Sequence, residues 1–173
     1  KNIKKLGALL CSACLVVSGT TIPTMADSMK VVTLGADLTD AQKNTMMKYF
    51  NVSSDQVQIL TITNQDERDH LSAYVPIEQI GTRTVSCAYV KPTTSGGIKV
   101  RTANLNWVTC NMIATSLSTS GVKNCEVVAA CPFEVSGTGA LTGIQMAYET
   151  ATGEQLDSTK KELATEEMVV TGN

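Results

Sequence analysis

The segment CPFEVSGTGALTGI, residues 131–144, contains the residues whose types and spacing come closest to a chemical motif. Ser136, Gly137, Thr138 and Gly139 follow a stretch with the pattern of a β-strand and precede one with the pattern of a helix. Phosphate-binding loops and nucleophile elbows occupy this position in many folds, and backbone N–H groups at a helix start can hold an anion. These four residues are therefore the candidate anion or ligand turn.

The named motifs each fail at a specific residue. A phosphate loop needs a lysine in G-x-x-x-x-G-K-[ST], and no lysine follows the turn before Lys160. A dinucleotide-binding G-x-G-x-x-G would need its third glycine one residue before Gly143, and a G-x-S-x-G elbow would need glycine in place of Glu134. The alternative interpretation is that small residues let a helix pack tightly against the strand, with Ser136 or Thr138 as its N-cap.

Acid–base chemistry has few candidates. His70 is the only histidine, so any Ser-His-Asp or Cys-His mechanism must use it, and a metal site built from several histidines is excluded. It lies in DERDHL, a pattern typical of a solvated helix face. A glycosidase-like pair of carboxylates is the other option, but the acidic residues fall near predicted helix starts, where they complement the helix dipole. These residues are Asp37, Asp40, Asp66, Glu67 and Asp69.

Four cysteines follow the N-terminal segment: Cys87, Cys110, Cys125 and Cys131. In an exported protein an even number permits disulfides, here with three alternative pairings. The alternative is that they are small buried apolar residues. Zinc sites use closely spaced pairs such as Cys-x-x-Cys, whereas Cys125 and Cys131 are six residues apart. The sequence predicts no metal site and no cofactor.

The N-terminus has the layout of a secretory signal. Three lysines within the first five residues precede an apolar run over residues 6–17, and the segment ends in Pro-Thr-Met-Ala at residues 23–26. This pattern predicts a signal peptide over residues 1–26 with cleavage after Ala26. A retained membrane anchor is the alternative, although a spanning helix needs about 20 apolar residues. A lipoprotein acylated at Cys14 is a further alternative, but the apolar run continues beyond that cysteine.

Removal of the signal changes the charge balance. It takes three lysines and no acid, which leaves 11 basic and 16 acidic residues and a net charge of −5. Such a chain has no basic footprint for nucleic acid. We expect a secreted or extracytoplasmic protein of the cell envelope with no transmembrane helix in the mature chain.

Hydrophobic patterning predicts alternating strands and helices. Strands are expected at residues 29–34, 56–63, 82–90, 98–104 and 125–131, and helices at 40–50, 64–74, 106–118 and 139–148. The turn-rich KPTTSGG between two of the strands predicts that 82–90 and 98–104 form a hairpin. Residues 27–150 are thus expected to form one α/β or α+β domain, a single mixed sheet with helices packed on it. Residues 151–173 are predicted to be a charged helical tail.

Thr39 and Gln42 match a capping box, which predicts the start of the first helix. The residues that bear on binding lie in and beside two of the predicted strands. In strand 98–104, Lys99 and Arg101 fall on one face. Tyr89 and Trp107 are candidates for an aromatic ligand surface, whereas the alternative for the tryptophan is a packing anchor.

Four stretches together resemble a bacterial family known as domain of unknown function 1002. They are VVTLGADLTDAQ (31–42), VPIEQIGTRTVSCAYV (75–90), GIKVRTANLNWVT (97–109) and EVVAACPFEVSGTGALTGIQMAYE (126–149). The resemblance implies an exported protein of a Gram-positive bacterium, in an envelope or extracellular setting, and brings no established activity. The sequence departs from the family in its four cysteines, and the family usually continues past the segment MVVTG.

Two hypotheses for the function follow. The first is a non-catalytic protein that binds a cell-wall component or another envelope protein. The second is a hydrolase that acts on cell-wall or peptide substrates through Ser136 and His70, or through a carboxylate pair. No catalytic residue is assigned from the sequence.

Overall fold

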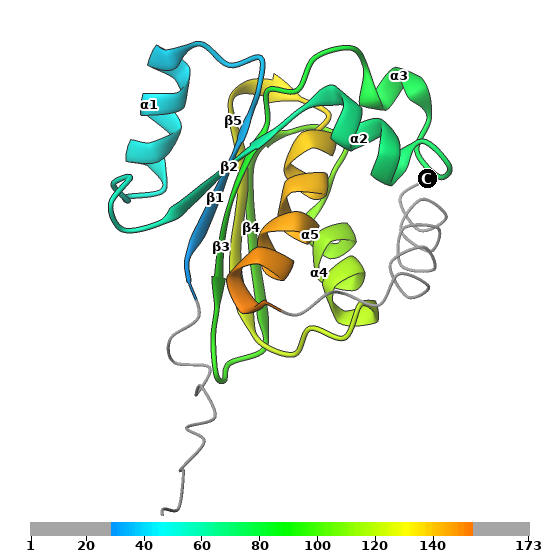
Figure 1. The fold of residues 1–173 in the computed structure, drawn as a ribbon. Helices are drawn as coiled ribbons and strands as arrows, with labels where there is room; N and C mark the ends of the chain where they lie inside the picture. The colour runs from blue at the N-terminus through cyan, green and yellow to red at the C-terminus, as the bar shows by residue number, and fades with distance from the viewer. Residues whose placement is uncertain (1–28, 154–173) are drawn as a thin grey trace, which may run out of the picture.

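A computed structural model describes residues 29–153, which form one five-stranded sheet with helices on both faces (Figure 1). The strands are β1 (Val31–Gly35), β2 (Gln58–Ile62), β3 (Cys87–Pro92), β4 (Ile98–Leu105) and β5 (Cys125–Val135). The helices are α1 (Asp40–Tyr49), α2 (Asn64–Leu71), α3 (Ile77–Ile80), α4 (Cys110–Thr119) and α5 (Thr138–Thr152). The predicted signal peptide and most of the predicted charged tail lie outside the described residues.

The sheet is mixed, as predicted. Its strand order is β2-β1-β3-β5-β4. β1 and β2 are parallel, β4 and β5 are parallel, and β3 runs antiparallel to both β1 and β5. Helices and strands alternate along the chain in the predicted order, with the short α3 added. The fold class predicted from the sequence is therefore confirmed.

The predicted hairpin between residues 82–90 and 98–104 is wrong. β3 and β4 do not pair, because β5 lies between them and pairs with both. β5 is buried on both faces over Cys125–Ala130 except at Glu126, which suits a central strand. The turn segment at residues 93–97 therefore crosses two strand spacings, about 10 Å, a gap that a loop of this length spans easily.

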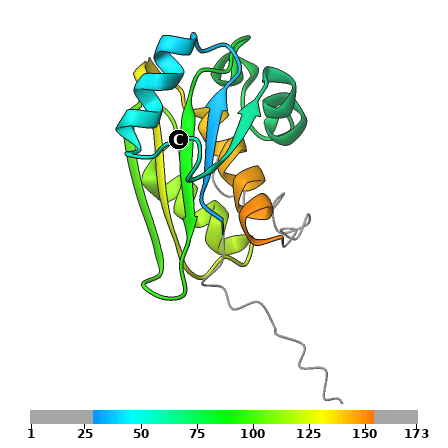
Figure 2. The ribbon, with the colours of Figure 1, turned by 60° about the vertical axis from the view of Figure 1, so that its left-hand side comes forward.

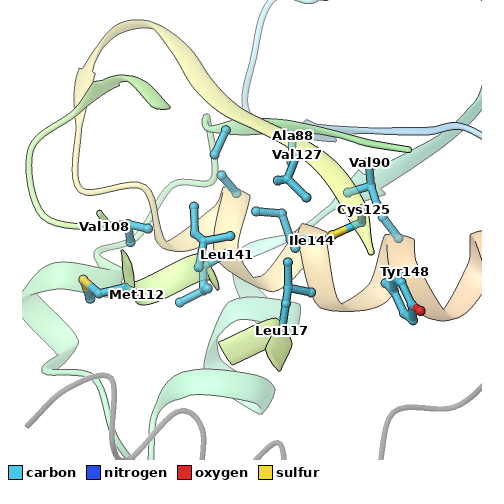
Figure 3. Close-up of a cluster of buried hydrophobic side chains, with 14 of the residues drawn as sticks. Ala88, Val90, Val108, Met112, Leu117, Cys125, Val127, Leu141, Ile144 and Tyr148 are labelled. Atoms are coloured by element: carbon cyan, nitrogen blue, oxygen red, sulfur yellow. The ribbon is translucent and has the colours of Figure 1, made fainter. Parts of the chain in front are cut away.

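The larger core lies between the sheet and α5. It is built from apolar side chains of β1, β3, β5, α4 and α5, including Val90, Leu117, Leu141 and Ile144 (Figure 3). α5 is buried along most of its length because small residues on one side let it approach β1 and β3 closely. This arrangement fixes where α5 starts, and hence where the candidate turn lies.

The opposite face of the sheet is covered only in part. α1 packs there with Met46 and Phe50 against Val32, Leu34 and Val128. Figure 2 shows α1 over one end of the sheet, while the rest of this face carries no helix among the described residues. We refer to the part of this face beside α1, over β3, β4 and β5, as the open face; Tyr89 and Val128 lie at its border and also contact the α1 cluster.

Helix starts follow the expected capping chemistry. Thr39 and Gln42 form the predicted capping box at α1. At α2, which begins at the predicted residue, the N-cap is Thr63, and Asp66 completes the box. A threonine, Thr109, also caps α4. Within residues 29–153, no helix has both the length and the apolar character that crossing a bilayer requires.

Candidate functional site

The turn at Ser136–Gly139 connects β5 to α5 and is fastened to α3. The Ser136 hydroxyl donates a hydrogen bond to the Gln79 carbonyl oxygen at 2.7 Å. The N-cap of α5 is Gly137, whose φ of 98° is the left-handed conformation that glycine adopts without strain. The prediction that Ser136 or Thr138 caps this helix is therefore wrong, since neither side chain makes a cap hydrogen bond.

A buried carboxyl group stands behind the turn. Glu67 of α2 is 1% exposed, and its Oε2 accepts a hydrogen bond from the Thr138 hydroxyl at 2.8 Å. Its Oε1 would lie 2.9 Å from a Cβ added to Gly139, so only glycine leaves room for it. Next along the helix, the Ala140 N–H donates to the Ser86 hydroxyl at 2.7 Å. The first turn of α5 is thus already lined by the protein's own carboxyl and hydroxyl groups.

The environment of Glu67 raises its pKa. Burial is the main cause, because the charged form loses its hydration. The hydroxyls of Thr84 and Thr138 beside it lower the pKa in part, while Asp37 raises it and Arg68 lowers it through their charges. A carboxyl with this environment at a helix start occupies the space that an external anion would need. The geometry therefore favours a structural role for the turn over an anion site.

No hydrogen bond connects the candidate catalytic residues Ser136 and His70. The His70 ring is hydrogen-bonded through Nδ1 to the Asp66 carbonyl oxygen at 2.8 Å, within its own helix, while the Ser136 hydroxyl binds Gln79. Asp37 accepts from the Thr84 N–H and Asp66 caps α2, as expected of carboxylates near helix starts. Among the described residues there is also no group of three or more His, Cys, Asp or Glu placed to hold a metal ion.

The four cysteines are all free thiols, and no two lie at disulfide distance. Cys87, Cys125 and Cys131 are buried, and Cys125 is part of the main core (Figure 3). Burial raises the pKa of Cys87 to about 12 and that of Cys125 to about 11, and it also raises the pKa of Cys131. The structure shows no disulfide and fits the alternative that these are small buried residues.

Thiol alkylation checks this assignment. Because the thiolate is the reactive form, iodoacetamide at pH 8 should modify the half-buried Cys110 in the native protein. The three buried thiols should react only after unfolding in guanidinium, which mass spectrometry after short labelling times would show. A native protein whose mass increases on reduction would contain a disulfide and contradict the assignment.

The open face carries a set of charged and aromatic side chains arranged in rows across the strands. In one row Lys91 pairs with Glu126, and Glu126 with Lys99. In the next row Tyr89 pairs with Val128, and Val128 with Arg101. Together these rows border a hollow of about 290 Å³, lined by Tyr89, Lys99, Arg101, Glu126, Val127 and Val128. This hollow is the candidate binding site of the open face.

The charges of this face are unbalanced. Lys91 Nζ lies 3.4 Å from Glu126 Oε2, the one ion pair between residues within 29–153, and both side chains are about 40% exposed. Such a surface pair contributes little stability, about 0–1 kcal/mol. Lys99 and Arg101 are exposed and have no ion-pair partner in the described part of the chain. Two free cations beside a tyrosine ring therefore face solvent.

The two aromatic residues predicted as candidates for a ligand surface lie on different faces of the sheet. Tyr89 lies on the open face, with its ring stacked on Phe50 at a centroid distance of 6.2 Å. Trp107 instead packs against the core on the α5 side of the sheet, which matches the alternative of a packing anchor. The sequence did place Lys99 and Arg101 on one face of a strand, but the absence of a helix over them appears only in the fold.

Glu67 is the residue that sequence reasoning treated as ordinary. A signal was present, since Glu67 stands four residues before Leu71 and this spacing puts both on the same face of a helix. Both are buried in the structure.

The comparisons with known proteins agree on one family. Residues 34–173 match the family described as "Protein of unknown function (DUF1002)". The chain is also 39% identical over 142 residues to "Uncharacterized protein YpuA" of Bacillus subtilis (strain 168), which covers 82% of this chain and 49% of that protein. It thus spans about half the length of this curated relative. No solved structure matches it. The chain belongs to the DUF1002 family.

Proposed function

We propose that this protein acts outside the cytoplasmic membrane as a non-catalytic binding protein and that its open face is the binding surface. The pattern of residues 1–26 supports export. The hydrogen-bond partners of Ser136 and His70 give no support to the hydrolase alternative, because each side chain is engaged elsewhere. The partner class is a cell-wall component or another protein of the envelope.

One observation carries the binding proposal. Lys99 and Arg101 have no described ion-pair partner and lie beside Tyr89 around a hollow on the part of this sheet face next to α1. Glu126, which lies opposite Lys99, already forms an ion pair with Lys91, and the residue opposite Arg101 is Val128, so these rows carry three cations and one carboxylate. A ligand or partner with negative groups would supply the missing counter-charge.

Arg101→Glu should abolish most of the binding. Purified mature protein is incubated with isolated cell walls and, separately, with detergent extracts of membrane proteins, and the bound fraction is measured after sedimentation or pull-down. Reversal of one of the two cations without an ion-pair partner should lower binding at least about tenfold. Lys48→Glu is the matched control, because it makes the same charge change at an exposed position on α1; it should bind like the original protein.

Binding no stronger than that of an unrelated acidic protein would overturn the binding proposal. If Arg101→Glu and Lys48→Glu lowered binding equally, the open face would not be the binding surface. Export is tested separately by cell fractionation and by the mass of the mature protein. A mature N-terminus at Asp27 in the extracytoplasmic fraction is the expected result, and full-length protein in the cytosol would contradict it.

A further inference from the structure

β4 is an outer strand of the sheet, and its free edge borders the open face. It spans eight residues, Ile98–Leu105, and pairs only with β5 among the described strands. Its outer N–H and C=O groups thus have no strand partner within residues 29–153, and such an edge can accept another strand. We propose that an extended acidic segment of a partner protein adds to this edge as a sixth strand. This inference rests on the proposed binding function and names the class of partner and the way it docks.

The open-face side of the edge selects for acidic residues at alternate positions. Across the sheet, Lys91, Glu126 and Lys99 form a row of alternating charge that ends on a cation at the edge. A strand added beyond β4 would place one side chain about 5 Å from Lys99 and another equally near Arg101. Both sites lie on the same face two residues apart, about 7 Å, which is also the spacing of alternate side chains in an extended segment. Carboxylates at positions i and i+2 of the partner segment would therefore lie beside Lys99 and Arg101, one at the end of each row.

The opposite side of the same edge has room for the intervening side chains. Between β4 and α4 lies a hollow of about 720 Å³ whose lining includes Ile98, Ala114, Thr115 and Val122. α4 lies beside β4 on the α5 side of the sheet, as Figure 1 shows. Side chains that point into this hollow would meet apolar and hydroxyl groups, with Lys123 also in the lining. The partner segment thus alternates acidic residues with small apolar ones.

Two other occupants fit less well. A second copy of the chain that paired antiparallel through β4 in the register centred on Val100 would bring Lys99 against Arg101 of its neighbour, and like charges directly opposite are unfavourable. The other outer strand, β2, is QILTI and offers no acidic residue. A phosphate polymer would satisfy the cations, but it presents only hydrogen-bond acceptors, whereas a strand edge presents both N–H and C=O groups. A peptide strand meets both requirements.

Peptide binding tests the inference. The probe is a fluorescent synthetic octapeptide that alternates glutamate with valine and alanine, and its affinity for the full chain is measured by anisotropy. An isomer with the glutamates contiguous has the same composition and charge. We expect the alternating peptide to bind about tenfold more tightly than the isomer. N-methylation of alternate backbone nitrogens, which removes the donors facing β4, should abolish its binding.

Variants of the protein locate the site. Arg101→Glu should weaken binding of the alternating peptide about tenfold, and Lys48→Glu should not change it. The double variant Lys99→Glu with Arg101→Glu should instead bind a peptide that alternates lysine with valine and alanine. Recovery by this charge exchange shows that the side chains meet, because a misfolded variant would bind neither peptide.

Several outcomes overturn the inference. Equal binding of the alternating and contiguous peptides, or of the N-methylated peptide, would mean that charge alone is recognised. Polyphosphate that displaces the peptide at equal charge concentration would point to a polyanion as the partner. Dimers that form without peptide and are abolished by Arg101→Glu would identify a second copy. If no peptide binds while walls or membrane extracts are still captured through Arg101, the added strand is wrong and the proposed function stands.

Discussion

Gly35→Ala is expected to lower the free energy of unfolding by about 3 kcal/mol, because the added methyl group has no space. Gly35 is the last residue of β1 and is buried. A Cβ there would lie 2.4 Å from the Thr84 carbonyl oxygen and 2.6 Å from the Val85 Cα. These are backbone atoms, and the Thr84 backbone is held by hydrogen bonds with Asp37. The chain cannot move aside without breaking those bonds.

Chemical denaturation of the original protein and of Gly35→Ala measures the difference in their free energies of unfolding. Gly81→Ala is the contrasting variant, since nothing lies within 4 Å of an added Cβ there and the cost comes only from its φ of 68°. With its ψ of −154° this backbone conformation is one that only glycine adopts readily, and the strain for alanine amounts to about 1–3 kcal/mol. A Gly35→Ala protein as stable as the original would show that β1 and the segment at Thr84 are less closely packed than described.

Glu67→Gln is expected to make the protein more stable than the original at pH 8 and to lose this advantage as the pH falls. Burial raises the folded-state pKa of Glu67 above the ordinary value of 4.5 for a glutamate. A raised pKa means that folding favours the protonated form, so the contribution of this group to stability is fully present below pH 4.5. It is lost as the pH rises through the folded-state pKa. Glutamine stays neutral and keeps a side chain of similar shape.

The pH dependence of the unfolding free energy distinguishes the ionisation of Glu67 from a change in packing, which would not depend on pH. The difference in unfolding free energy between Glu67→Gln and the original protein should increase from pH 4 to pH 8. Glu78→Gln is the matched control, because it removes an exposed carboxyl from the neighbouring α3 and should show a smaller change with pH. A difference for Glu67→Gln that stays constant over this range would mean that Glu67 does not titrate in the folded protein.

Thr138→Val tests the partner of Glu67. At pH 8 it should lower the free energy of unfolding by about 2 kcal/mol, since hydrogen bonds to charged groups contribute about 1.5–3 kcal/mol. The decrease in unfolding free energy caused by Thr138→Val should be smaller at pH 4, because the Glu67 carboxyl is then neutral. An equal loss at both pH values would assign the effect to packing of the threonine methyl group alone.

Local sequence signals predicted much of the fold. The capping box at Thr39, the alternation of strands and helices, and the single mixed sheet are all present because they depend on residues close together in sequence. The hairpin prediction failed because the partner of a strand depends on the rest of the sheet. β5 is apolar enough to take the central position between β3 and β4, which the turn between them could not reveal.

The candidate turn shows the same limit. Its glycines suggested a ligand loop, and the sequence did not show that Gly139 makes room for Glu67 or that Gly143 makes room for Thr33. A Cβ at Gly143 would lie 2.4 Å from the Thr33 hydroxyl, which itself accepts from the Ala88 N–H. Close approach between segments far apart in sequence gives these glycines their role. The position of the open face could not be predicted from the sequence either, because it depends on how much of the sheet α1 covers.

The most direct test of the account is where a bound partner contacts the protein. Backbone amide NMR spectra, recorded with and without the wall or membrane fraction that binds, or the acidic peptide, would locate the contact. We predict shifted or broadened signals in β4 and β5 and at Tyr89, with residues 136–140 unchanged. Changes confined to residues 136–140 would contradict the account, because they would make the turn rather than the open face the binding site.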